Sequence, residues 1–234
     1  MIREFTSPPD SARVRGRNFG EIHRAEIVRT VGIYRELFNE AAGSSLDTHG
    51  LGLEALDAIS EFSPALADEI EGIAEGAGLD VATVAALNAR TEIFAWIDAA
   101  YRGECSTIVA LRHSGQSPIA VQTWDWHSEL ADCWFIWTIE STDGRAFSTL
   151  TEYGIVGKIG VNSSGIGVHL NILHHRDDGG PMGVPVHVVA RSVLESARNM
   201  TQALMESAQP KHPRHPLSQL SQLKDLNRLQ FQPK

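Results

Sequence analysis

The hydrophobic pattern of this 234-residue chain changes once, near Gly103, from a helical period to short strand-like runs. Between residues 21 and 97 apolar side chains recur every three or four positions, and Ser63-Pro64 and Gly78 mark starts and stops. After Gly103 the runs are rich in Val, Ile, Thr and Trp and are separated by turn sequences. We therefore expect an α+β protein whose helices precede most of its strands.

Close spacing of the apolar runs predicts antiparallel hairpins, because only short turns separate them. A single helix follows at about 186–207, with an apolar face that would pack on the sheet. The predicted strands lie within residues 106–111, 118–126, 133–141, 146–154, 155–161 and 165–173.

The charge balance excludes a broad nucleic-acid interface, since 20 Lys and Arg against 29 Asp and Glu give a net charge of −9. The longest strongly apolar run, 133–139, is far below the roughly 20 residues of a membrane-spanning helix, and the N-terminus has no signal-peptide core. We expect a cytoplasmic protein with no membrane partner. With two cysteines and no metal-binding spacing, we also expect no metal and no cofactor.

The composition changes again at Gln209, where the tail carries a net charge of +4 and leaves −13 for the rest. Four prolines and no apolar face predict disorder for residues 209–234, with a basic interaction tail as the alternative. The predicted division is a helical part at 1–104, a strand-rich part at 105–208 and this tail.

Cys105 lies at the change of pattern, directly before a strand-like run. A thiol at this position is either a small buried apolar group or an exposed nucleophile. If Leu111 and Ile119 close the following hairpin, opposed residue numbers sum to 230, and Cys105 faces Asp125. A carboxylate raises a thiol pKa, so its useful role would be to hold a nearby amine. The alternative for Asp125 is a cap at a strand end.

Three further groups near this hairpin have alternative interpretations. In an extended strand the side chains of Trp124 and Trp126 are expected on the face opposite that of Asp125. The two tryptophans are either substrate-binding or core residues. His127 is either a partner for the Cys105 thiol or a surface residue. The His-rich segment 174–178 predicts no metal site, because adjacent side chains in a strand point to opposite faces.

Several motifs occur in an order that resembles one family. They are RVRGRNFGE, EGIAEGAGLD, LNARTEI, GECSTIVAL, QTWDWH, GIVGKIGVNSSGIGVHLN and GVPVHVVARSVLESARN, and they span about residues 13 to 207. Together they resemble the acyl-coenzyme A:6-aminopenicillanic acid acyltransferase family, a branch of the N-terminal-nucleophile cysteine hydrolases related to choloylglycine hydrolases. The resemblance implies a four-layer α-β-β-α sandwich with residues 1–104 as a helical pro-region.

The resemblance also implies a chain that cuts itself between Glu104 and Cys105. The freed α-amino group of Cys105 would act as base to its own thiol, which would attack an amide or an acyl-coenzyme A thioester and form an acyl-enzyme. Asp125 would orient that amine, Asn171 would contribute to the oxyanion site, and Thr107 would assist self-cleavage. The cleaved N-terminal fragment would remain as a heterodimer partner.

Three departures from the family pattern affect this expectation. Glu104 stands where the family more often has a small residue, and Thr123 replaces an Asn. Nothing after Ser207 matches the family's later His-Thr-Asn-His segment, so we expect a C-terminally truncated, incomplete sandwich. A catalytically inactive remnant that acts as a binding protein is the first alternative. The second is an unprocessed thiol hydrolase that uses His127.

Overall fold

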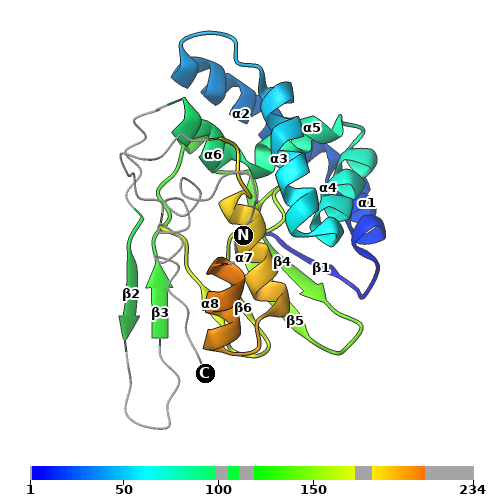
Figure 1. The fold of residues 1–234 in the computed structure, drawn as a ribbon, viewed down its shortest axis with the longest axis vertical. Coiled ribbons are helices and arrows are strands. Elements are labelled where there is room, and N and C mark those ends of the chain that lie inside the picture. The colour runs from blue at the N-terminus through cyan, green and yellow to red at the C-terminus, as the bar shows by residue number, and fades with distance from the viewer. Residues whose placement is uncertain (1, 98–104, 111–118, 172–180, 209–234) are drawn as a thin grey trace.

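The computed structural model describes residues 2–97, 105–110, 119–171 and 181–208, and most of its helices precede most of its strands (Figure 1). An initial strand, β1 (Glu4–Ser7), comes before the first helix. The helices of the N-terminal part are α1 (Ala12–Ile22), α2 (Arg24–Ala42), α3 (Thr48–Phe62), α4 (Pro64–Ala77), α5 (Val81–Asn88) and α6 (Arg90–Trp96).

Capping side chains fix where three of these helices begin. Asp47 accepts a hydrogen bond from Gly50 N–H at 2.9 Å at the start of α3, and Asp80 accepts one from Ala82 N–H at 2.9 Å at the start of α5. Ser63 caps α4, with Pro64 in the first turn. These groups satisfy N–H donors that have no partner within the helix, so the predicted starts and stops have a physical cause.

Helices α1 and α4 pack backbone to backbone through four glycines. A Cβ atom at Gly16 or Gly20 would overlap the carbonyl oxygen of Glu69 or Ile73 in α4. A Cβ atom at Gly72 or Gly76 would likewise overlap carbonyl oxygens of α1. The two helices therefore approach more closely than any side chain would allow.

The main sheet has five strands in the order β1-β4-β5-β6-β7. Its remaining strands are β4 (Trp134–Glu140), β5 (Ala146–Glu152), β6 (Ile159–Asn162) and β7 (Gly167–Val168). They pair antiparallel, as expected. Strand β1 was not predicted, and it pairs in parallel with β4 at the sheet edge.

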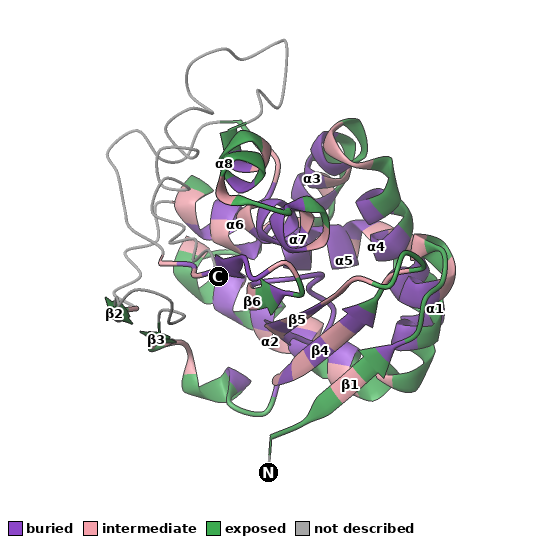
Figure 2. Cartoon of the chain, turned by 90° about the horizontal axis from the view of Figure 1, so that it is seen from below, coloured by how far each residue is buried: buried purple, intermediate pink, exposed green. Residues whose placement is uncertain are grey.

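One face of this sheet forms the core. Phe135, Trp137 and Ile139 alternate along β4 and are buried, and they contribute with residues of α1, α4 and α7 to one hydrophobic cluster. Helices lie over that face in Figure 2, where the buried residues gather between the helices and the strands. The alternating pattern follows from the two-residue period of a strand.

The prediction of one helix at 186–207 was wrong. The chain forms α7 (Val186–Ser196) and α8 (Met200–Ala208), separated by Ala197 in an extended conformation with ψ 127°. Asn199 accepts a hydrogen bond from Gln202 N–H at 2.9 Å and so caps α8. An Asn inside an apolar period can begin a new helix, because its side chain replaces the missing backbone partner.

A separate two-stranded ribbon, β2 (Thr107–Ala110) with β3 (Ile119–Gln122), stands beside the main sheet (Figure 1). Both strands are shorter than predicted. The described residues thus form an α+β fold with one five-stranded sheet and one ribbon. The four-layer sandwich stays a prediction, and the tail 209–234 lies outside the described residues.

The N-terminal helices and the later strands share buried ion pairs as well as the apolar core. Glu69 of α4 pairs with Arg191 of α7 at 2.8 Å, and Arg15 of α1 contacts the same carboxylate. Asn88 at the end of α5 donates to the carbonyl of Gly154 and accepts from Val156 N–H, both at 2.9 Å. Residues on both sides of position 104 therefore build one interior.

Candidate functional site

Cys105 is half-buried and lies at the head of the ribbon. Thr107 pairs with Gln122, and Thr123 N–H donates to Ser106 C=O at 2.9 Å. Opposed residue numbers therefore sum to 229, so the predicted sum of 230 was wrong by one. Continued by one residue, the register places Trp124 opposite Cys105, where we had expected Asp125. A connection one residue longer than we assumed accounts for the shift.

Thr107 and Asn171, two predicted site residues, are in direct contact. The Thr107 hydroxyl donates to Asn171 Oδ1 at 3.1 Å, and Asn171 Nδ2 lies 2.9 Å from the same hydroxyl oxygen. Thr107 follows Cys105 by two residues, so both side chains belong to the same face of an extended strand. The structure thus brings Asn171 to Thr107, which lies two residues along the chain from Cys105.

Gln122 on β3 holds the segment that precedes Asn171. Its amide donates to the carbonyl of Leu170 at 2.6 Å and accepts from Leu170 N–H at 3.2 Å. Thr123 has a similar role within the ribbon, since its hydroxyl accepts from Ser106 N–H at 3.0 Å. Thr123, at the position where the resemblance implies an Asn, therefore links the Cys105 segment to the segment that follows β3.

Asp125 is exposed and follows the residue that lies opposite Cys105. Trp124 and Trp126 on either side of it both contact Lys158, with the amine 3.2 Å and 5.7 Å from the ring centroids. The alternation predicted for these three residues would direct Asp125 to the other side of the chain, and this stays a prediction.

The two tryptophans cover a buried charge cluster that the sequence analysis missed. We call Tyr34, Arg90, Glu152 and Lys158 the Glu152 cluster, because the other three residues all contact that carboxylate. Tyr34 donates to Glu152 at 2.5 Å, Arg90 at 2.8 Å and Lys158 at 3.3 Å. Trp126 Nε1 donates to the Tyr34 hydroxyl at 2.6 Å. The cluster thus joins α2, α6 and β5 beneath the Trp-Asp-Trp segment.

Burial and charge oppose each other in the Glu152 cluster. Burial alone would raise the pKa of Glu152, but the charge of Arg90 and the hydrogen bonds from Tyr34 and Lys158 hold that pKa below its ordinary value. Burial also lowers the pKa of Lys158 well below 10.5, and the attraction of Glu152 only partly opposes this. A signal for these residues existed, since a Glu and a Lys inside otherwise apolar runs are buried only when paired.

The other thiol and the candidate His partner lie in apolar surroundings. Cys133 is buried, which raises the pKa of its thiol. His127 packs against Phe94 and Trp126 at ring-centroid distances of 6.1 Å and 5.1 Å, and burial lowers its pKa. His127 is therefore a half-buried packing residue and not the surface residue of the alternative interpretation.

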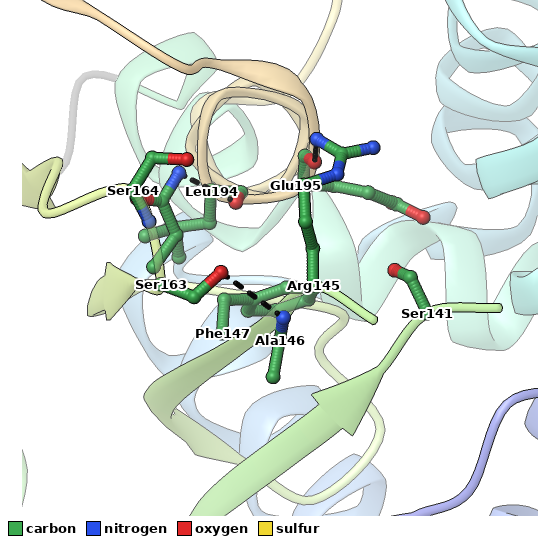
Figure 3. Close-up of a pocket in the computed structure, with 9 residues that line it drawn as sticks. Ser141, Arg145, Ala146, Phe147, Ser163, Ser164, Leu194 and Glu195 are labelled. Carbon is green, nitrogen blue, oxygen red and sulfur yellow. Dashed lines mark hydrogen bonds between the residues drawn. The ribbon is translucent and has the colours of Figure 1, made fainter. Parts of the chain in front are cut away.

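Figure 3 shows a small pocket between the ends of β5, β6 and α7, and Cys105 is not among the residues that line it. Its polar groups are occupied: Arg145 donates to the carbonyl of Glu195 at 3.0 Å, and Ser163 accepts from Ala146 N–H at 3.3 Å. A second pocket, of about 240 Å³, lies between α2, α3 and α5 and includes Tyr34 and Arg35. Neither pocket contains a predicted catalytic residue.

The described part of the chain contains neither a metal-binding cluster nor a membrane-spanning helix. In residues 2–97, 105–110, 119–171 and 181–208, no group of three or more His, Cys, Asp or Glu is placed to hold a metal ion. No helix of this same part of the chain is long and apolar enough to span a bilayer. Glu104 and the His-rich segment 174–178 lie outside the described residues.

Comparison with known proteins agrees with the order of the motifs. Residues 111–214 match the sequence model of the family described as acyl-coenzyme A:6-aminopenicillanic acid acyl-transferase. The 40 kDa form of acyl-coenzyme A:6-aminopenicillanic-acid-acyltransferase from Emericella nidulans is 30% identical over 182 residues, which cover 77% of this chain and 50% of that relative. The chain spans about half the length of this curated relative. Over these regions the chain is similar to the acyl-coenzyme A:6-aminopenicillanic acid acyltransferase family.

Proposed function

We propose that this protein is an N-terminal-nucleophile cysteine acyltransferase or amidohydrolase that forms an acyl-enzyme on Cys105. The supporting observation is the position of Cys105, half-buried at the head of a ribbon whose Thr107 is hydrogen-bonded to Asn171. A thiol with a polar, partly accessible neighbourhood suits a nucleophile, whereas the buried Cys133 does not. Similarity to the acyltransferase family supports the same chemistry.

The proposed nucleophile is generated when the chain cuts itself between Glu104 and Cys105. The new α-amine, with an unperturbed pKa near 8, takes the proton of a thiol whose unperturbed pKa is about 8.5, so the transfer is nearly thermoneutral. Asp125 would orient this amine. Because the amine belongs to the main chain, a carboxylate can reach it from either face of the ribbon, so the orientation of Asp125 does not oppose this role.

Asn171 is proposed to stabilise the oxyanion that forms when the thiolate attacks a carbonyl group. Its contact with Thr107 fixes the orientation of the side-chain amide relative to the strand that carries Cys105. Loss of one oxyanion donor costs about 10²–10³ in rate. The proposed role of Thr107 is to assist self-cleavage, and Trp124 and Trp126 are proposed to bind substrate.

The proposed substrates are linear amides and acyl-coenzyme A thioesters, since both present a carbonyl with a leaving group that a thiolate can displace. The name of the relative from Emericella nidulans includes an acyl-coenzyme A. The proposed chemistry requires no cofactor, because the thiol and the amine supply both nucleophile and base. The proposed heterodimer partner is the cleaved N-terminal fragment.

The test is the intact mass of the purified protein under denaturing conditions, compared with Cys105→Ala. The proposal expects two fragments, of 104 residues and of the remaining 130 of the 234-residue chain, and an uncut variant. A folded wild-type chain that stays uncut would falsify self-processing and favour the inactive binding protein. Activity lost in Cys105→Ala but also in His127→Ala would instead favour the unprocessed thiol hydrolase.

A further inference from the structure

The proposed mechanism leaves one step without a base. Before the chain is cut, the nitrogen of residue 105 belongs to a peptide bond and has no basic lone pair. The thiol must nevertheless lose its proton to attack the preceding carbonyl group. This inference rests on the proposed function, because it asks which group accepts that proton in the uncut chain.

The Lys158 side chain carries an amine beside the part of the ribbon where Cys105 lies. Its amine lies 3.2 Å from the centroid of the Trp124 ring. Thr123 N–H donates to Ser106 C=O, so the ribbon register, continued by one residue, places Trp124 opposite Cys105. A negative charge on Cys105 raises the pKa of the Lys158 amine, so the two groups interact electrostatically.

The position of Lys158 is fixed by its surroundings. Its backbone N–H donates to the Thr149 hydroxyl at 3.0 Å, and its side chain is 2% exposed. The amine donates to Glu152 at 3.3 Å, but Arg90 donates to the same carboxylate oxygen at 2.8 Å. Because Arg90 already balances Glu152, a neutral Lys158 amine leaves the cluster without net charge.

The charged and titratable groups around the amine come from four other elements or segments, and together they favour its neutral form. Burial is the largest influence and lowers the pKa of Lys158 well below 10.5, and Arg90 lowers it further, while Glu152 and Cys105 raise it. Burial also lowers the pKa of His187, which therefore adds no positive charge beside the amine. These groups are Glu152 on β5, Arg90 on α6, His187 on α7 and Cys105 before β2.

We propose that the Lys158 amine accepts the proton of the Cys105 thiol in the uncut chain and returns it to the Cys105 nitrogen during self-cleavage. The thiolate sulfur bonds to the carbonyl carbon of residue 104, and the peptide C–N bond breaks. The departing nitrogen takes the proton from the Lys158 ammonium and becomes the free α-amine. Water then hydrolyses the resulting thioester, which releases the carboxylate of residue 104 and restores the thiol.

The experiment compares wild type, Lys158→Met and Lys158→Arg in a Cys133→Ala background, in which Cys105 is the single cysteine. Met keeps the length and the apolar stem of the side chain but has no charge. Arg keeps the charge and the stacking on Trp124 but does not lose its proton in this pH range. Two quantities are measured by intact mass: the rate of cleavage at pH 7, and the rate of Cys105 alkylation by iodoacetamide from pH 6 to 10 in the uncut species.

Lys158→Met is expected to cleave at least tenfold more slowly and to be alkylated more slowly at pH 7, because without the amine little thiolate forms below the midpoint of the thiol. Lys158→Arg is expected to have a midpoint at or below that of wild type, because the guanidinium places a fixed cation there, and still to cleave as slowly as Lys158→Met. A purely structural role for the ion pair with Glu152 would be rescued by Arg and would not show this separation. Thermal unfolding midpoints establish that each variant is folded.

Three results would overturn the inference. Wild-type cleavage in Lys158→Arg would mean that the lysine acts only as a fixed charge. Equal alkylation rates of wild type and Lys158→Met at pH 7 would mean that the amine takes no proton from the thiol, whether or not the chain cuts itself. Equal cleavage rates of wild type and Lys158→Met would mean that self-processing holds and the role of Lys158 fails. If wild type stays uncut but alkylates faster than Lys158→Met at pH 7, the proton transfer is supported and only self-processing fails.

Discussion

Glu92 in α6 is a buried carboxyl group whose Oε1 accepts a hydrogen bond from Val186 N–H at 2.8 Å, at the start of α7. Its Oε2 atom is buried without a hydrogen-bond partner in the part of the chain that the structure describes. Burial raises the pKa of Glu92 from 4.5 to about 7, and the hydrogen bond to Val186 only partly opposes this. The folded protein therefore holds a proton here that the unfolded chain has already released.

This proton makes stability depend on pH. Between pH 4.5 and about 7 the folded state binds more protons than the unfolded state, so the free energy of unfolding falls as pH rises through this window. Glu92→Gln removes the penalty while keeping an acceptor for Val186 N–H. We expect the variant to be more stable than wild type at pH 8, by at most about 3 kcal/mol, and to show no advantage at pH 4.

Urea unfolding at pH 4, 6 and 8 measures this difference, with Glu54→Gln on the exposed side of α3 as the matched control. The control should follow the wild-type profile at every pH. A Glu92→Gln variant that is less stable than wild type at pH 8 would contradict the assignment of a protonated carboxyl group.

Sequence patterning singled out Cys105, and the family resemblance implied Thr107 and Asn171, but neither pointed to the Glu152 cluster. Thr107 lies two residues from Cys105, so strand alternation alone relates them. Glu152 meets Tyr34 and Arg90, which are 118 and 62 residues away along the chain. No local period connects such positions, because the packing of α2 and α6 on the strands decides the contact.

Among the elements, the junction of α1 and α4 depends most directly on residue size. Gly76→Ala would place a methyl group against the backbone of α1 and is expected to destabilise the protein by roughly 1–3 kcal/mol. Gly32→Ala in α2 is the matched control, since no atom lies within 4 Å of the added Cβ. The control should be neutral or about 0.5–1 kcal/mol more stable, because Ala favours a helix interior.

The midpoints of urea unfolding of both variants, measured beside wild type, test this. Equal stability of Gly76→Ala and wild type would mean that α1 can move away from α4 without cost. That result would contradict the close backbone contact of the two helices.

Element types were more predictable than their ends and partners. The helical period at 21–97 correctly located the helices from α2 to α6 but not α1, which lies before it, and short apolar runs correctly located β4 and β5. The ribbon register was wrong by one because the number of connecting residues cannot be counted until the last paired residue is known. Strand β1 escaped prediction because the four residues Glu4–Ser7, directly before Pro8-Pro9, are too few to show a period.

At the scale of the whole molecule, residues before and after position 104 are held together by noncovalent contacts of several kinds. These are the pairing of β1 with β4, the ion pair of Glu69 with Arg191, the hydrogen bond from Trp137 Nε1 to Ser7 at 2.9 Å and the Glu152 cluster. Most of these groups are buried, so separating the N-terminal part from the rest would leave buried charges without their partners. The N-terminal part is therefore a structural component of the fold.

We expect that cutting the chain anywhere between residues 98 and 104, by its own action or by a protease, leaves one particle. The cut protein should elute from size exclusion at the volume of the uncut chain, and denaturing mass analysis of the same fraction should show two fragments. Elution of the N-terminal fragment alone at micromolar concentration would contradict this prediction.

The parallel pairing of β1 with β4 has a different thermodynamic meaning before and after such a cut. In the uncut chain the strand and its partner belong to one molecule, so dilution does not affect their association. After the cut they belong to two molecules, and the midpoint of thermal unfolding rises with protein concentration. Breaking one peptide bond thus leaves the contacts unchanged and converts a folding equilibrium into a binding equilibrium.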